Sequence, residues 1–478
     1  MEFKIIQKTP LYHALSEVGK RIFLPDGIFY WAGRAKKEGD INGTIGSAFG
    51  FEKDFIDEGL EEWVPCYLKD FKDYSSLNVK EIVPYAPIGG VAEVRKIWKE
   101  WIVKKSQSTQ RDKLDLIEHS ISTPIVTQGI TNGIYMTCSF ILNPGESIIS
   151  PNKRWGNYDN IITKNIGAEI KSFEFFRESK LNIQGLKDAI EEQAKEQTKI
   201  VLILNFPNNP TGYCPTYDEV KQMMAALKES QQKIRLPFII IVDDAYEPYI
   251  YNEDVHQRSI FYEILELEED IIPVKLDGIS KELLAYGGRV GFATYGLKRR
   301  WVDSEEEFET LKAELNNKLE GLNRSTISNT NHFYQAVTQK MFSEKGMDKI
   351  IDAREKVRQM LKKRYDLINA KLLEIDSPEI SIDPNAGGFF LFLNLNPEKM
   401  RATVFADHLL KQYKVGVIPI EKLDKNINGI RIAYCSIDLE KIPELVNRIK
   451  SALDDFYSIL FFFCDKKVLY EINIISII

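Results

Sequence analysis

The sequence predicts an α/β protein with a large, mostly parallel sheet and a second, smaller domain. Between Pro124 and Tyr295, short apolar runs alternate with segments of helical periodicity, a pattern typical of a parallel sheet covered by helices. The runs are rich in β-branched residues, which indicates strands buried on both faces. With 478 residues, 44% of them hydrophobic, the chain is long enough for one large core and a smaller one.

The individual elements follow from these patterns in chain order. Strands are predicted at 147–149, 200–205, 238–242, 272–276 and 291–295. Between them, helices are predicted at 216–228 and at 130–142, the latter ending at the Asn143-Pro-Gly145 breaker. Later in the chain we expect helices at 305–322, 331–345, 348–373 and 402–412, with one strand at 389–393 after a pair of glycines.

The change from alternating strands and helices to mostly helices helps to divide the chain into four predicted parts. Residues 76–330 form the large domain, 331–457 form the small domain, and 1–75 contribute to the small domain. Residues 458–478 are an apolar tail of unassigned role. Because charges at 465–467 interrupt it, the tail does not suit a membrane span of about 20 residues, and we expect it to pack on its own domain or on a partner subunit.

Composition and charge disfavour several classes of function. A net charge of −7, with 63 basic and 70 acidic residues spread along the chain, gives no reason to expect nucleic-acid binding. The five cysteines are scattered and show no CxxC spacing, which argues against a disulfide framework or a zinc site. The first residues lack the apolar stretch of a signal peptide, so we expect a cytoplasmic protein. We expect no metal, because none of the five histidines lies in a motif.

Polar residues follow three of the predicted strands. Asn209 follows 200–205, Asp243 ends 238–242, and Lys281 comes shortly after 272–276. Parallel sheets bind ligands beyond the carboxyl ends of their strands, so we expect these side chains to meet in one crevice. A carboxylate, an amide and a lysine would suit a cofactor with a pyridine nitrogen, a phenolic oxygen and an aldehyde.

The motifs around these residues resemble those of the class I/II aminotransferases, which are pyridoxal-phosphate (PLP) enzymes of fold type I. The three main motifs are NFPNNPTG at 205–212, DDAY at 243–246, and SK at 280–281 with Arg289 eight residues on. Weaker elements in matching order are YAPIGG at 85–90, TQGIT at 127–131, WGNY at 155–158 and GIRIA at 429–433. The resemblance implies a seven-stranded sheet flanked by helices in the large domain, and a smaller α/β domain.

The resemblance implies roles for the residues around the cofactor ring. Lys281 would form a Schiff base with the cofactor and then shuttle the proton at the substrate Cα. Asp243 would keep the pyridine nitrogen protonated, and Asn209 and Tyr246 would hydrogen-bond the 3-oxygen. Trp155 would stack on the ring face.

The resemblance also implies a phosphate site and a dimer. The phosphate would be bound at the start of a helix, by an arginine and by a hydroxyl, with Gly129, Ile130, Thr131, Arg289 and Ser280 as the expected residues. Tyr85 resembles the tyrosine that reaches the phosphate from the neighbouring subunit. We therefore expect a homodimer with shared active sites.

For the substrate, the resemblance implies that Arg431 grips the α-carboxylate and that Gly46 lets it approach the backbone, with Asn209 and Trp155 close by. Arg324 stands where dicarboxylate-specific relatives place a side-chain-binding arginine, and we hypothesise that it favours an acidic donor. The implied reaction is ping-pong transfer of an amino group from an L-amino acid, aspartate or an aromatic one, to a 2-oxo acid. No membrane partner is expected.

Two alternatives remain open from the residues alone. β-Lyases and cyclopropane-carboxylate synthase-like enzymes resemble aminotransferases at all these positions, and the sequence does not separate them. A non-catalytic PLP-binding regulator is less favoured, because such proteins carry an added helix-turn-helix domain, for which the segment before Tyr85 is too short and too aromatic.

Overall fold

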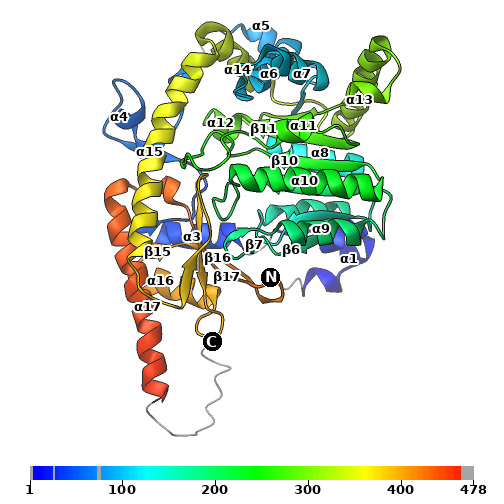
Figure 1. Ribbon diagram of the computed structural model, residues 1–478. Coiled ribbons are helices and arrows are strands. Elements are labelled where there is room, and N and C mark those ends of the chain that lie inside the picture. The colour runs from blue at the N-terminus through cyan, green and yellow to red at the C-terminus, as the bar shows by residue number, and fades with distance from the viewer. Residues whose placement is uncertain (1–3, 25–26, 73–76, 465–478) are drawn as a thin grey trace.

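A seven-stranded sheet lies at the centre of the computed structural model, which describes residues 4–24, 27–72 and 77–464 (Figure 1). Its strand order is β4-β12-β11-β10-β9-β5-β6. The bounds are β4 Ile125–Thr127, β12 Gly291–Tyr295, β11 Ile271–Gly278, β10 Phe238–Asp243, β9 Ile200–Asn205, β5 Ser147–Pro151 and β6 Glu169–Phe173. Only β12 runs antiparallel to its neighbours, so the predicted mostly parallel α/β sheet is confirmed.

All five predicted strands are present, and two further strands complete the sheet. β4 is only three residues long, and β6 reads Glu-Ile-Lys-Ser-Phe, a polar pattern suited to the edge of the sheet. The register places Asp243 opposite both Asn205 and Leu276, so β9, β10 and β11 reach one edge of the sheet together.

Helices cover both faces of this sheet because its strands are apolar on both sides. In β9, Leu202 belongs to one buried cluster and Ile203 to another. α10 (Tyr217–Ile234) contributes Met223 to the first cluster, and α8 (Gly129–Ile141) contributes Met136 to the second. α10 is longer than predicted because its buried stripe ends in Ser230 and Gln231, which the sequence pattern reads as polar.

The second large sheet is four-stranded and antiparallel, with the strand order β13-β14-β17-β16 (Figure 1). Its bounds are β13 Ile380–Ile382, β14 Leu391–Leu395, β17 Ile427–Ile432 and β16 Ile418–Lys422. The helices of this half are α14 His332–Lys345, α15 Met347–Leu373, α16 Ala402–Tyr413 and α17 Ile442–Cys464. The strand predicted at 389–393 begins two residues later, because Phe389 and Phe390 lie in the turn before it.

The N-terminal part contacts both halves. β1 (Ile41–Asn42) pairs in parallel with β15 (Val415–Gly416), beside α3 (Ile28–Glu38). In α2 (Glu17–Arg21), Arg21 Nε donates to the carbonyl of Lys164 at 2.6 Å, on the side of the large sheet. The division of the chain at residues 75, 330 and 457 therefore stays a prediction.

The other α-helices and strands complete the chain. They are α1 Pro10–Ala14, β2 Phe49–Phe51, α4 Glu52–Phe55, β3 Trp63–Pro65, α5 Val79–Ile82, α6 Ala92–Lys105, α7 Arg111–Ser120, β7 Phe176–Arg177, β8 Lys180–Leu181, α9 Ile183–Gln193, α11 Phe261–Glu266, α12 Ile279–Glu282 and α13 Glu305–Thr326. The first residues of the predicted tail, 458–464, continue α17, and 465–478 lie outside the described residues. Within the described ranges, no helix has both the length and the apolar character needed to cross a bilayer.

Candidate active site

The carboxyl ends of β9 and β10 are tied together by a single asparagine. Asn205, the last residue of β9, donates from Nδ2 to the carbonyl oxygen of Asp243 at 2.8 Å. Its Oδ1 accepts the backbone N–H of Asn209 at 2.8 Å. The loop that carries Asn209 is therefore fixed against the end of the strand that carries Asp243. Asn205 had no predicted role beyond its place in the first motif.

Asp243 is a buried carboxylate with a hydrogen-bonded tyrosine beside it. Tyr158 Oη donates to Asp243 Oδ2 at 2.5 Å, and the backbone N–H of Ala245 donates to Oδ1 at 3.2 Å. Burial raises the pKa of Asp243, and the hydrogen bond from Tyr158 opposes that rise. The sequence signal for Tyr158 was its position at the end of the WGNY motif, but no role was predicted for it.

Lys281 lies in the short helix α12, directly after β11. Its Nζ is 5.6 Å from the centre of the Tyr246 ring. Burial lowers the pKa of Lys281; the negative charge of Asp243 opposes this effect, and the positive charge of Arg289 adds to it. Tyr249 Oη donates to the backbone carbonyl of Lys281 at 2.7 Å, which holds the turn. A larger fraction of such a buried amine is neutral than of a surface lysine, and only the neutral amine acts as a nucleophile or base.

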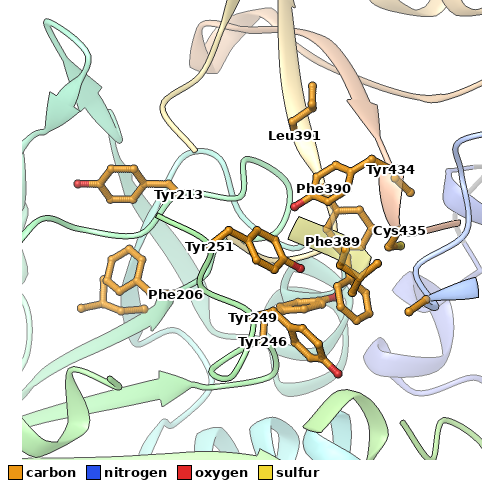
Figure 2. Packing of buried hydrophobic residues seen from close by; sticks show 14 of the residues in the cluster. Phe206, Tyr213, Tyr246, Tyr249, Tyr251, Phe389, Phe390, Leu391, Tyr434 and Cys435 are labelled. Atoms are coloured by element: carbon orange, nitrogen blue, oxygen red, sulfur yellow. The ribbon is translucent and has the colours of Figure 1, made fainter. Parts of the chain in front are cut away.

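An aromatic cluster joins this edge of the large sheet to the small sheet, and Figure 2 shows its packing. The Tyr246 ring meets Phe389 and Phe390 edge-on, with centroids 5.3 and 5.7 Å apart. Tyr249 lies 4.8 Å from Phe389. Burial raises the pKa of Tyr246, so its hydroxyl stays protonated and able to donate.

The predicted phosphate residues form a cradle with positive character. Gly129, with φ +74°, opens α8, and Ile130 and Thr131 follow in its first turn. A Cβ added at Gly129 would lie 2.4 Å from Arg289 Nη2, so only glycine allows the arginine to sit against the helix start. Arg289 Nη1 approaches Ser280 Oγ at 3.4 Å, and no carboxylate among the described residues pairs with Arg289. A helix N-terminus, an arginine and a hydroxyl together suit an anion.

Arg431 lies on β17 and is buried without a carboxylate partner among the described residues. Its Nη1 donates to Asn209 Oδ1 at 3.2 Å, and its Nη2 donates to the carbonyl of Thr44 at 3.1 Å. Its Nε has no hydrogen-bond partner. Burial lowers the pKa of Arg431 to about 10. A buried guanidinium with spare donors is a site for an incoming carboxylate.

A cavity of about 140 Å³ opens between Trp155, Asn209 and Arg431. Much of its remaining wall is apolar and comes from Ile28, Ile418, Pro419, Ile420 and Pro210. The Trp155 ring stands at 83° to that of Tyr158, with centroids 5.6 Å apart. Gly46 lies nearby in the fold, since a Cβ there would lie 3.3 Å from Phe390 Cζ, and Arg431 rests over the same Phe390 ring.

Two predicted residues lie away from this cavity. Tyr85 is 90% exposed and borders an open hollow of about 400 Å³ with Gln128, the residue before Gly129. Arg324 is exposed near the end of α13, where its Nη1 hydrogen-bonds Ser328 Oγ. The structure thus brings the predicted ring, phosphate and carboxylate residues together within one chain and leaves Tyr85 and Arg324 outside that group.

Comparisons with known proteins agree on one family. Residues 61–449 match the family described as aminotransferase class I and II. The chain is 26% identical to an aspartate aminotransferase of Bacillus subtilis, over 77% of this chain and 82% of the relative, and 24% identical to an aromatic-amino-acid aminotransferase of Thermococcus litoralis, over 87% and 93%. A crystal structure of an aminotransferase from Anaerococcus prevotii superposes with a TM-score of 0.74 at 26% identity, covering 91% of this chain and 98% of that one.

Proposed function

The chain belongs to the class I and II aminotransferase family, and on this premise we propose that Lys281, Asp243 and Arg431 carry out its chemistry in the crevice described above. The protein is a PLP-dependent aminotransferase, which moves an amino group from an amino acid to a 2-oxo acid. The alternative outcomes in the same fold, a lyase or a synthase, are not favoured by the relatives. The roles of individual residues, the donor and the assembly are our proposals.

The residues present fit PLP. The cradle formed by Gly129 and Arg289 has no room for a side chain at position 129. Its positive charge suits a phosphate. Asp243 is a buried carboxylate suited to a protonated ring nitrogen, and Tyr246 and Asn209 offer donors to a phenolic oxygen. Trp155 offers an aromatic face. When bound, PLP supplies the aldehyde and the electron-accepting ring that the reaction needs.

The protein's own groups bind the donor and move its proton. Arg431 holds the α-carboxylate, because its buried guanidinium lacks a carboxylate and its Nε lacks a partner. Lys281 takes the proton from the donor Cα, since its lowered pKa keeps part of the amine neutral. Tyr158 holds Asp243 in one orientation through the 2.5 Å hydrogen bond. The uncompensated burial of Arg431 is the single observation that most supports this assignment.

The cavity beside Trp155 favours an aromatic donor over an acidic one. Ile28, Ile418 and Ile420 give it an apolar wall. Arg154 and Lys422 also line it and share the single carboxylate of Asp159, at 2.6 and 2.9 Å, which balances one of their two charges. For Arg324 to select an acidic donor, a second copy of the chain would have to bring it to this cavity.

We further propose a cytoplasmic homodimer with shared active sites. Tyr85 and Val83 are 90% and 75% exposed and line the hollow that borders Gln128, an apolar surface that a second subunit would cover. Four of the five cysteines, at positions 66, 138, 214 and 435, are free thiols, in keeping with a reducing compartment. Light scattering of the purified protein tests the dimer, and a monomer with full activity would contradict shared sites.

A single-turnover donor screen tests the proposed function. PLP-loaded protein is mixed with phenylalanine, tyrosine, aspartate, glutamate and alanine, and the cofactor absorption band is followed. We expect pyridoxamine phosphate and the matching 2-oxo acid to form fastest from the aromatic donors. Release of pyruvate and ammonia without pyridoxamine phosphate would indicate a lyase instead. In the same screen, a loss of kcat/KM in Arg324→Leu for aspartate and not for phenylalanine would establish an acidic-donor role for Arg324.

A further inference from the structure

A cluster of charged side chains lies buried directly behind the catalytic residues. We call it the ion cluster; its cations are Lys105, Lys275 and Arg354 and its carboxylates are Asp244, Glu247, Asp277 and Glu282. None of these side chains is more than 11% exposed. The proposed reaction uses none of them.

Lys105 is the centre of the ion cluster. Its Nζ lies 2.8 Å from Glu247 Oε2, 3.0 Å from Asp277 Oδ2 and 2.9 Å from Glu282 Oε1. Three carboxylates that converge in this way would otherwise suit a divalent cation, but the lysine ammonium already occupies the position between them. Lys105, at the end of α6, therefore ties its helix to two further segments, the one that follows β10 and the continuous β11–α12 segment.

A second ammonium extends the same network. Lys275 on β11 pairs with Glu247 at 2.9 Å and with Asp244 Oδ2, which also accepts a hydrogen bond from Ser259 Oγ at 2.7 Å. Glu247 is thus shared between the two lysines.

Two tryptophans of α6 donate hydrogen bonds to two of the carboxylates. Trp98 Nε1 donates to Asp277 Oδ1 at 2.8 Å, and Trp101 Nε1 donates to Glu282 Oε1 at 2.7 Å. Together with Lys105, α6 supplies three of the groups that hold the cluster. Each indole has a fixed direction, so it constrains the geometry of its carboxylate more tightly than a flexible side chain would.

Each of three cluster carboxylates directly follows a proposed catalytic residue in the chain. Asp244 follows Asp243, and Glu247 follows Tyr246. Glu282 follows Lys281, whose backbone carbonyl is also held by Tyr249. Fixing these carboxylates therefore fixes the peptide units from which the catalytic side chains project on the other side.

Stability alone does not account for such a cluster. Burying charges costs several kcal/mol per ion, and replacing a buried ion pair by apolar residues of similar volume is often neutral or stabilising. Precise placement has a much larger effect on catalysis, since a shift of about 1 Å in a reacting group can lower the rate about 10²-fold.

We propose that the ion cluster is a positioning unit for the catalytic face, in which Lys105 fixes the backbone segments that carry Asp243, Tyr246 and Lys281. This inference rests on the proposed function of those three residues. The cluster residues touch neither the substrate nor the cofactor site, so they act through their neighbours in the chain.

The test compares two glutamate-to-glutamine variants of the full-length protein. Glu282→Gln removes one charge of the cluster, and Glu263→Gln is the matched control. Glu263 lies in α11, is 17% exposed, and pairs with Arg258 at 2.6 Å and His256 at 3.0 Å, away from the catalytic segments. Thermal unfolding shows what each substitution costs in stability, and we expect similar losses in Tm.

The two variants should differ in catalysis and in the reactivity of Lys281. We expect kcat to fall about tenfold in Glu282→Gln, with the donor KM changed by less than about twofold, and to stay unchanged in Glu263→Gln. In cofactor-free protein, the pH midpoint for acetylation of the Lys281 amine, read by peptide mass spectrometry, should move only in Glu282→Gln. The titratable or charged groups that face Lys281 are Asp243, Tyr246, Arg289 and Cys435, and both variants retain them.

Equal kcat values and an unmoved Lys281 midpoint in the two variants would overturn the positioning role and leave the cluster as a stabilising feature. If Glu282→Gln does not fold, Asp277→Asn is measured in the same way, since its Oδ1 can still accept from Trp98. Lys281→Ala separates the two levels of inference. Retention of the cofactor absorption band in that variant would contradict the proposed function, whereas its loss with an unaltered Glu282→Gln would contradict only the positioning role.

Discussion

Two neighbouring regions of the molecule differ in how their positive charges are paired. In the crevice, Lys281, Arg289 and Arg431 form no ion pair with any carboxylate of the described chain. Directly behind it, Lys105 has three carboxylates within 3.0 Å and Lys275 has two within 2.9 Å. The first arrangement can accept anions from solution, whereas in the second each ammonium already has carboxylate partners. Substitutions in the crevice should therefore lower activity with little loss of stability, whereas substitutions in the ion cluster should lower stability and, through the catalytic segments, activity as well.

Lys281→Ala should give the largest effect and confine it to catalysis. We expect kcat to fall by about 10³-fold or more, because the variant lacks the group that moves the proton. The folded stability of the cofactor-free protein should change little. Lys99→Ala is the control: burial also lowers the pKa of Lys99, but it lies on α6 outside the crevice, and normal activity is expected. Steady-state kinetics measures kcat of both variants, and denaturant unfolding measures their stability.

Lys105→Met should lower stability strongly, in addition to the loss of activity expected from displaced catalytic segments. Removing the ammonium leaves three buried carboxylates facing each other, which should cost about 3–5 kcal/mol in the free energy of unfolding. Lys104→Met, one residue earlier, removes a lysine that is 47% exposed and pairs with Asp348, and it should cost little. Urea unfolding of both variants decides the matter, and equal losses would contradict the special position of Lys105.

Arg431→Lys should weaken donor use without unfolding the protein. Lysine keeps the charge but not the planar fork, so we expect kcat/KM for the donor to fall about 10²-fold. Arg401→Lys, at an exposed pair with Glu421, should leave kcat/KM unchanged. A small effect of Arg431→Lys would contradict the proposal that Arg431 binds the α-carboxylate of the donor.

The smallest effect concerns acid stability. Burial disfavours ionised Glu247, but Lys105 and Lys275 outweigh this and lower its pKa to about 2, so its ionised form stabilises the fold above the usual value of 4.5. This contribution, about 3 kcal/mol for that lowering of the pKa, is lost as the pH falls from 4.5 through 2. Asp244, whose pKa burial raises to about 7, acts in the opposite sense and is retained in Glu247→Gln. The stability difference between wild type and Glu247→Gln, measured by urea unfolding, should shrink from pH 6 to pH 3; a constant difference would contradict the shift.

The crevice was predictable from the sequence and the ion cluster was not. Asn209, Asp243 and Lys281 each follow a recognisable strand, and the local motifs mark their positions. Lys105 meets partners 142 to 177 residues away, and nothing near it in the sequence distinguishes it from a solvated lysine. Lys275 and Asp277 interrupt an apolar run, but their burial follows only from knowing which helix covers β11.

The same holds for the fold: elements with a local sequence pattern were predicted, and elements that depend on pairing with distant residues were not. Long amphipathic helices such as α15 were placed within one residue. The strand β4 was missed, since its three residues become a strand only by pairing with β12. The register that brings Asp243 beside Asn205 likewise depends on pairing across the sheet.

The alternation of catalytic and cluster residues along the chain has a consequence for how this enzyme tolerates change. In three pairs of neighbours, the first residue belongs to the catalytic face and the second to the ion cluster. These pairs are Asp243 with Asp244, Tyr246 with Glu247, and Lys281 with Glu282. A one-residue deletion in either segment would exchange the two members and would cost the protein its reactivity and its folding in a single event. Homologous recombination or design that transplants the catalytic face into another scaffold would have to carry α6 with it, because the helix that supports that face lies more than a hundred residues earlier in the chain.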